Sequence, residues 1–239
     1  MMRTARYDRI VDHYPAMWPL LVPGYVPILD AMLEVVRARP ERPRRLLDLG
    51  CGPGSATVAV AEACDPRGSV VLVDASRKMM EAAKALLGGQ VRRAVIGDFT
   101  EAKIARQIFE PDSYDLALVS FALHHINDAD KRAVLDGLFA SLIPGGLLLL
   151  ADEIAAERPA GWDVVERVRA RIIEEHLHQD FITKEFWDAE VNLPEEDRLP
   201  FLPCRIDDFT SWLARSGFAV SCPVAVFGSA LLVAVKPRH

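Results

Sequence analysis

Short runs of consecutive apolar residues alternate with segments whose apolar positions recur at helical spacing over residues 45–151. The apolar runs, which predict strands, cover residues 45–49, 70–74, 91–96, 114–120 and 147–151. The helical patterns between them cover residues 55–64, 77–87 and 127–142, the last with Asn127 as its expected N-cap. Near-continuous apolar strands are typical of parallel sheets that helices cover on both faces. The order therefore predicts an α/β fold with a doubly wound, mostly parallel sheet.

The C-terminal part of the chain adds a different pattern. Residues 207–216 predict a helix, and residues 218–226 and 229–235 predict two strands. The connection between these strands is only Phe227-Gly228, which favours an antiparallel hairpin. The expected sheet thus has seven strands, with the last one antiparallel.

The N-terminal segment has one clear helix, at residues 28–36, preceded by turns expected at Trp18-Pro19 and at residues 22–25. Residues 154–205 are charged, break the strand–helix rhythm and follow the fifth strand. We therefore divide the chain into an N-terminal helical arm (1–43), an α/β core (44–153), a helical lid or substrate cap (154–205), and a helix with a hairpin that completes the sheet (206–239).

Composition narrows the functional classes. The 239 residues are 51% apolar, enough for a sizeable core, and the net charge is −6. This charge argues against a nucleic-acid partner with an extended contact surface. The one basic concentration lies at residues 37–45, which we interpret as a solvated helix end, with a phosphate site as the alternative.

The four cysteines are scattered and none forms a Cys-x-x-Cys pair, which predicts reduced thiols and a cytoplasmic location. The N-terminus lacks the apolar segment of a signal peptide. The longest apolar runs are too short to cross a bilayer, so no membrane partner is expected.

A glycine-rich turn follows the first strand, in the stretch Leu-Leu-Asp-Leu-Gly-Cys-Gly-Pro-Gly at residues 46–54. Strand, tight loop and helix in this order suit a nucleoside-binding crevice, because Gly50, Cys51 and Gly52 let a ligand approach the main chain. Asp48 precedes the first glycine by two residues, and Ser55 stands where a dinucleotide fingerprint needs its third glycine. The motif therefore points away from an NAD(P) oxidoreductase.

Polar residues end the next strands, where ligands of open α/β sheets bind. Asp74, followed by Ala75, ends the second strand 24 residues after Gly50 and is placed to accept hydrogen bonds from ribose hydroxyls. Asp98 is placed for an adenine amine, and Phe99 and Met79 for the faces of the ring. Each residue alone has a structural explanation, a helix cap for Asp74 or a plain turn for Asp98. Their joint order indicates an adenosyl ligand.

This pattern resembles the class I S-adenosylmethionine-dependent methyltransferases over residues 44–153. The stretches that carry the resemblance are residues 46–54, 71–79, 97–99, 114–126 and 142–146. The resemblance implies a Rossmann-like methyltransferase fold, with S-adenosylmethionine as cofactor and S-adenosylhomocysteine as product. The residues expected to bind the cofactor are Asp48, Gly50, Cys51, Gly52, Asp74, Ala75, Met79, Asp98, Phe99, Ser120 and Tyr14.

The N-terminal arm is similar to that of the subgroup that includes carboxy-S-adenosylmethionine synthase, through the shared phrase Val-Pro-Gly-Tyr at residues 22–25. The glycine loop of that synthase usually reads Cys-Ser-Leu-Gly, whereas this chain has Cys-Gly-Pro-Gly at residues 51–54. The difference favours ordinary methyl transfer. Tyr7 and Tyr14 of the arm are expected either to close over the cationic sulfur or to pack the arm against the core.

His124 and His125 follow the fourth strand and are the expected catalytic residues if the acceptor must lose a proton. The alternative for either histidine is packing against the helix that starts at Asn127. Asp152-Glu153 ends the fifth strand, either to orient a polar acceptor or to cap a turn. His176 and His178 diverge on a helix, so no metal site is expected. Trp162 and Trp187 either line a substrate pocket or pack the lid.

The sequence thus predicts methyl transfer from S-adenosylmethionine to a small-molecule acceptor by in-line displacement. The alternatives are an enzyme that forms carboxy-S-adenosylmethionine or acts on tRNA, and a non-catalytic module that binds the cofactor. The oligomeric state stays open, a homodimer included.

Overall fold

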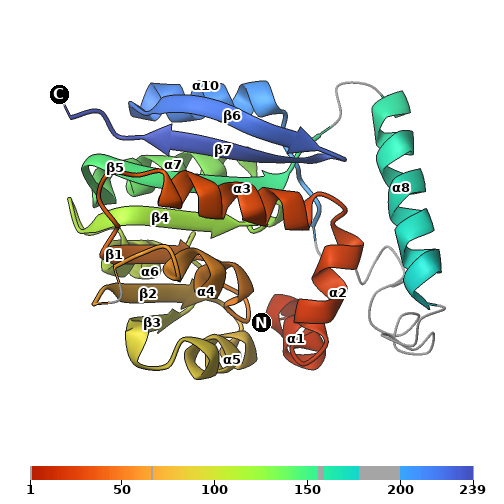
Figure 1. Ribbon diagram of the computed structural model, residues 1–239, viewed down its shortest axis with the longest axis horizontal. Coiled ribbons are helices and arrows are strands. Elements are labelled where there is room, and N and C mark those ends of the chain that lie inside the picture. The colour runs from red at the N-terminus through yellow and green to blue at the C-terminus, as the bar shows by residue number, and fades with distance from the viewer. Residues whose placement is uncertain (1, 66, 156–158, 178–199, 239) are drawn as a thin grey trace.

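The computed structural model describes residues 2–65, 67–155, 159–177 and 200–238 (Figure 1). Its seven strands form one sheet in the order β3-β2-β1-β4-β5-β7-β6. Strands β1 to β5 are parallel, whereas β7 runs antiparallel to both β5 and β6. The predicted doubly wound sheet with its closing hairpin is confirmed. The strands are β1 (Arg45–Leu49), β2 (Ser69–Asp74), β3 (Val91–Ile96), β4 (Tyr114–Ser120), β5 (Leu142–Glu153), β6 (Ala219–Val226) and β7 (Ser229–Val235).

Helices cover both faces of the sheet (Figure 1). One face carries α3 (Tyr25–Arg37), α4 (Ser55–Ala61) and α5 (Arg77–Leu87), and the other carries α6 (Ala102–Ile108), α7 (Asp128–Ser141) and α10 (Ile206–Ser216). Neighbouring residues of a strand alternate between the two cores: Leu46 and Leu72 join the first, Leu47 and Val73 the second. This alternation explains why the strands are apolar throughout.

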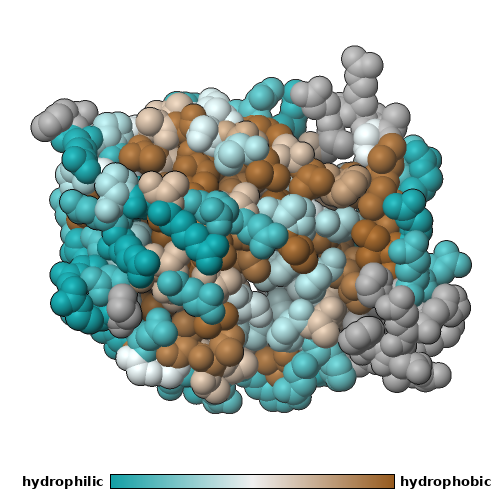
Figure 2. All heavy atoms as spheres, viewed as in Figure 1, coloured by the Kyte–Doolittle hydropathy of each residue, from teal (hydrophilic) through white to brown (hydrophobic). Residues whose placement is uncertain are grey.

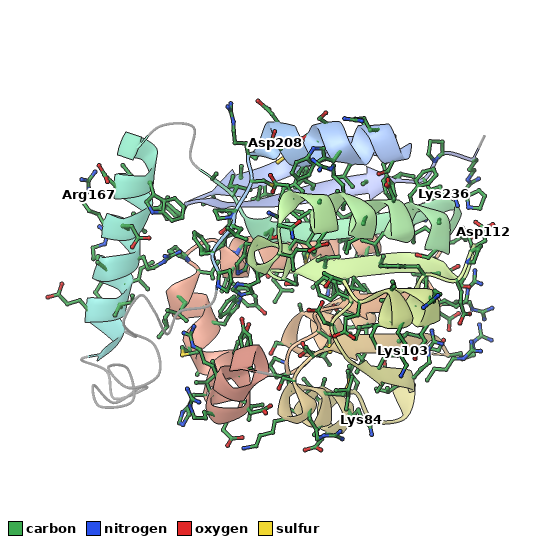
Figure 3. All side chains as sticks on the ribbon, turned by 180° about the vertical axis from the view of Figure 1, so that it is seen from behind. Lys84, Lys103, Asp112, Arg167, Asp208 and Lys236 are labelled. Atoms are coloured by element: carbon green, nitrogen blue, oxygen red, sulfur yellow. The ribbon has the colours of Figure 1, made fainter. Side chains whose placement is uncertain are left out.

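The remaining helices gather at the carboxyl ends of the parallel strands. They are α1 (Met2–Ile10), α2 (Tyr14–Leu21), the short 3₁₀ helix η2 (Leu123–His125) after β4, and α8 (Pro159–Leu177); a second 3₁₀ helix, η1 (Gly88–Gln90), lies beside β3. Helix α8 packs against α2 (Figure 1). The ion pair between Asp112 and Lys236, 2.9 Å, marks the opposite end of the sheet (Figure 3).

Two local predictions were wrong and one helix was not predicted. Trp18-Pro19 lies inside α2 rather than in a turn, and Pro19 donates no backbone hydrogen bond to that helix. Helix α6 had no helical pattern, since only Ile104 and Ile108 of its seven residues are buried. Strand β5 begins at Leu142 and runs through the Pro144-Gly145 stop signal, where its pairing with β4 is irregular.

The other predicted elements are confirmed within one or two residues at most ends, and Asn127 caps α7 by accepting a hydrogen bond from the Asp130 amide. The helix expected at residues 28–36 extends over Tyr25–Arg37. Trp187 and His178 lie outside the described residues, and Trp162 lies in α8. The division into four parts, with residues 154–205 as a lid, stays a prediction.

Candidate functional site

A crevice opens at the carboxyl ends of β1, β2, β3 and β4, under the N-terminal helices α1 and α2. It holds about 830 Å³ of empty space, its open mouth included. Of the residues predicted to bind the cofactor, nine lie in its wall together with His125. The described lining residues are Tyr7, Tyr14, Gly50, Gly52, Asp74, Ala75, Ser76, Met79, Asp98, Phe99, Ser120, Phe121, Ala122, His125 and Ile126.

The glycine loop forms the floor of the crevice. Gly50 has φ +72°, and a Cβ there would lie 2.6 Å from the Cβ of Ala122, so only glycine fits. The amides of Gly50 and Cys51 donate to the carbonyl of Val73 at 2.8 and 3.0 Å, which ties the loop to β2. The main chain of the loop is therefore held in place and open to a ligand.

Asp74, at the end of β2, joins the loop to helix α5. Its Oδ2 accepts a hydrogen bond from the Gly52 amide and its Oδ1 one from the Ser76 amide, both at 2.8 Å. Burial raises the pKa of this carboxyl, and the nearby carboxylate of Asp8 acts in the same direction. Asp8 also accepts a hydrogen bond from the Ser76 hydroxyl at 2.6 Å, which attaches α1 to the site.

The end of β3 supplies Asp98 and Phe99 to the crevice. Asp98 Oδ1 accepts hydrogen bonds from the amide and the hydroxyl of Thr100 at 2.9 and 2.7 Å. Met79, which is buried, packs with Ile10 of α1. A carboxylate, an aromatic ring and a thioether thus all contribute to the wall of the crevice.

Three predicted site residues lie outside the described lining: Asp48, Cys51 and His124. Asp48 is 1% exposed beneath the loop, where it accepts a hydrogen bond from the Thr57 hydroxyl, and its Oδ1 has no described partner. Burial raises its pKa to about 7. Burial also raises the pKa of the Cys51 thiol well above its usual value. Both side chains support the loop from below.

His125 and Tyr7 meet at the β4 side of the crevice. The Tyr7 hydroxyl lies 2.8 Å from His125 Nε2, and His125 Nδ1 lies 2.8 Å from the carbonyl oxygen of Pro200. A carbonyl oxygen only accepts, so Nδ1 of the neutral ring carries the proton and Nε2 accepts from Tyr7. Burial raises the pKa of Tyr7, which keeps the phenol protonated.

His124 points away from the crevice into a buried group of charges. Its Nδ1 lies 2.5 Å from Asp152, and its Nε2 lies 3.8 Å from Glu153, which pairs with Arg169 of α8 at 2.7 Å. Burial alone would lower the pKa of His124, but the two carboxylates outweigh it and raise that pKa. The structure thus places His124, Asp152 and Glu153 in an ionic network between β5 and α8.

Sequence reasoning did not single out Ser76 or Ile126 as lining residues, nor the contact of Pro200 with His125. Ser76 directly follows Ala75, and Ile126 directly follows the two histidines, so each adjoins a predicted site residue. Pro200 is 75 residues from His125 along the chain, and no spacing rule links the two.

Hydrophobic side chains gather on the side of α8 that faces the sheet (Figure 2).

Across the residues that the structure describes, no single helix is long and apolar enough to cross a membrane. Helices α2 and α3 reach the required length and apolar composition only when taken together, and the chain bends by 102° between them. The described residues contain no group of three or more His, Cys, Asp or Glu side chains suited to a metal ion.

Comparisons with known proteins agree with this geometry. A family profile described as a methyltransferase domain matches residues 46–146. The carboxy-S-adenosyl-L-methionine synthases of Aeromonas salmonicida and Aliivibrio fischeri are 32% and 30% identical over 73% of this chain, and the aligned parts cover 66% and 67% of those proteins. For several curated relatives of this name the chain spans only 59–66% of their length.

Among solved structures, an O-methyltransferase family protein from Burkholderia thailandensis aligns with a TM-score of 0.64 at 18% identity, over 91% of this chain and 57% of that one. The structural likeness concerns the fold, while the sequence relatives and the profile carry the family assignment. The profile and the sequence relatives lead to one conclusion. The chain belongs to the class I S-adenosylmethionine-dependent methyltransferase family, whose cofactor is S-adenosylmethionine.

Proposed function

We propose that this chain transfers the methyl group of S-adenosylmethionine to a small-molecule acceptor by in-line displacement. The observation that carries the proposal is the convergence of three strand ends on one crevice: the bare main chain at Gly50, the carboxylate of Asp74, and the Asp98-Phe99 pair. These groups match the three parts of an adenosyl ligand in the order in which the strands lie side by side.

The residues present suit this cofactor. The floor at Gly50 leaves no room for a side chain, so the main chain itself faces the ligand. We assign Asp74 to the ribose hydroxyls, Asp98 to the adenine amine, and Phe99 and Met79 to the faces of the ring. Ser120 and Tyr14 then border the opposite end, where the reactive group belongs.

When bound, S-adenosylmethionine supplies a methyl group on a positively charged sulfur, which is already a strong electrophile. The chain then has to orient the acceptor and exclude water, because alignment supplies much of the acceleration of a displacement. Tyr7, Tyr14 and Phe121 give this end of the crevice aromatic walls. Free cysteines at all four positions are consistent with action in the cytoplasm.

Formation of carboxy-S-adenosylmethionine is the second candidate, and the names of the relatives favour it. Such a product carries an extra carboxylate, which calls for a cation in the site. Among the described lining residues there is no lysine or arginine. Mass spectrometry of the nucleosides released from purified protein separates the two functions, since only the synthase retains the carboxylated compound.

Calorimetric titration with S-adenosylhomocysteine tests the proposal. We expect binding by the wild type and a loss of about tenfold or more in affinity for Asp74→Asn, because a charged acceptor of hydrogen bonds is removed. Asp112→Asn, at the far end of the sheet (Figure 3), is the matched control and should leave the affinity unchanged. No binding by folded wild-type protein would refute the proposal. Binding without turnover of any acceptor indicates a non-catalytic module.

A further inference from the structure

A chain of two hydrogen bonds ends in the wall of the crevice. The Pro200 carbonyl accepts from His125 Nδ1, and His125 Nε2 accepts from the Tyr7 hydroxyl, each at 2.8 Å. Tyr7 comes from α1 and His125 from η2, so the two groups are 118 residues apart and meet only in the folded chain. Both line the crevice.

The position of Pro200 is itself fixed. The segment 200–204, here named the strap, is bonded on both sides: the Leu202 amide donates to the His124 carbonyl at 2.6 Å, and the Leu202 carbonyl accepts from Lys131 Nζ at 2.5 Å. Lys131 is 0% exposed and also pairs with Asp128 at 3.0 Å. A buried ammonium group therefore holds the strap that determines which nitrogen of His125 carries the proton.

The charges around this pair bear on what can bind beside it. The pKa of Tyr7 is lowered by the charge of Arg6 and raised by the charges of Asp74 and Glu153. The centroid of the His124 ring lies 4.0 Å from that of the His125 ring. The described lining contains the carboxyls of Asp74 and Asp98 and no lysine or arginine. Arg6 lies outside this lining, whereas the two carboxyls belong to it, so the wall itself disfavours an anionic acceptor. Aromatic and aliphatic side chains, among them Tyr14, Phe121 and Ile126, favour a flat apolar one.

We propose that Tyr7 and His125 form a proton relay for a neutral acceptor that carries an ionisable hydroxyl on a flat, apolar frame. The inference rests on the proposed methyl transfer and names its substrate class. The acceptor hydroxyl donates to the Tyr7 oxygen, whose own proton lies on the bond to His125 Nε2. As the acceptor oxygen bonds to the methyl carbon, the carbon–sulfur electron pair stays on sulfur. The acceptor proton passes to Tyr7, and the Tyr7 proton passes to His125, which becomes an imidazolium with Nδ1–H still on Pro200.

The test uses three ligands with one frame, each titrated into protein saturated with S-adenosylhomocysteine: 2-naphthol, 2-methoxynaphthalene and 2-naphthoate. We expect 2-naphthol to bind about fivefold more tightly than its methyl ether, the value of one hydrogen bond, and 2-naphthoate to bind most weakly. In Tyr7→Phe the difference between naphthol and ether should vanish, while the affinity for S-adenosylhomocysteine stays the same. Tyr25→Phe is the matched control, because Tyr25 contacts Phe121 but does not line the crevice.

A second measurement does not depend on any acceptor. Nitrogen-15 NMR of the histidines should show His125 as the Nδ1–H tautomer, with an Nε2 shift that changes in Tyr7→Phe and not in Tyr25→Phe. The Nε2–H tautomer in the wild type would overturn the relay. Equal binding of naphthol and ether by a protein that binds S-adenosylhomocysteine would overturn the substrate class and leave methyl transfer standing. Failure to bind S-adenosylhomocysteine removes the proposed function and this inference with it.

Discussion

The buried carboxyl of Asp48 offers a quantitative test of how the glycine loop is supported. It lies beneath the loop at 1% exposure, with one hydrogen bond from Thr57 and no described partner for Oδ1. Burial is the largest cause of its raised pKa, the Thr57 bond lowers that pKa, and the Asp74 charge raises it further. We predict that Asp48→Asn stabilises the fold at neutral and alkaline pH.

The magnitude follows from the shift. Because the pKa of Asp48 rises from 3.8 to about 7 on folding, the folded state keeps a proton between these two pH values that the unfolded chain releases. The contribution of Asp48 to stability is therefore greatest below pH 4 and falls by about 4 kcal/mol as the pH rises to about 7, at 1.36 kcal/mol per pKa unit. Asparagine keeps an acceptor for Thr57 and does not ionise, so Asp48→Asn avoids this loss.

The assay is urea unfolding at pH 4.5, 6 and 8 for the wild type and Asp48→Asn. We expect the advantage of the variant in the free energy of unfolding to grow from about 1 kcal/mol at pH 4.5 to about 4 kcal/mol at pH 8. Thr57→Val should steepen the decline, because it removes the bond that lowers the pKa of Asp48. A variant less stable than the wild type at pH 8 would show that the charged carboxylate is held favourably and refute the reasoning.

Three further predictions concern the site and its supports. The affinity for S-adenosylmethionine, relative to that for the uncharged-sulfur product S-adenosylhomocysteine, should rise between pH 5 and pH 8, because a cationic ligand favours the ionised carboxyl of Asp48. Calorimetry that gives the same affinity ratio at both pH values would contradict this. Lys131→Met should lower the free energy of unfolding in urea by about 1–3 kcal/mol, since the strap loses its buried hydrogen-bond donor. The matched variant Lys103→Met, at an exposed lysine (Figure 3), should leave it unchanged. Equal effects of the two variants would show that Lys131 does not hold the strap. Glu153→Gln should cost about 1–3 kcal/mol in urea unfolding and speed proteolysis within α8, because it removes the charged partner that ties the half-buried Arg169 to β5. Glu166→Gln, at the exposed partner of the same arginine, should do neither.

The part of the site that could be predicted from the sequence is the part built from strand ends. Gly50, Asp74 and Asp98 each follow an apolar run directly, and parallel strands bring their carboxyl ends to one edge of the sheet. Topology alone therefore brings these residues together. The doubly wound sheet could be predicted for a related reason, since apolar runs and helical patterns alternate through most of the core.

The contacts that cross the crevice could not be predicted in this way. Tyr7 meets His125 only because α1 is attached to Ser76 through Asp8, and no periodicity in the arm encodes that attachment. The two histidines are adjacent in sequence, yet one lines the crevice and the other joins buried carboxylates. A 3₁₀ turn directs neighbouring side chains to different sides, and its geometry is not visible in the sequence pattern.

Segments with weak patterns account for the wrong predictions in the fold. Helix α6 buries only two side chains, so its seven residues look like a polar loop. Strand β5 continues through Pro144 and Gly145 because Gly145 pairs with Lys236 through its amide, a partner contributed by the far end of the chain. In both places long-range packing decides a structure that the local residues leave open.

A crystal structure of the complex with S-adenosylhomocysteine tests the central claim most directly. The account predicts the nucleoside across the ends of β1, β2 and β3, with the Asp74 carboxylate on the ribose hydroxyls and the ring between Phe99 and Met79. A nucleoside bound elsewhere on the chain, or a crevice filled by side chains in the complex, would contradict it.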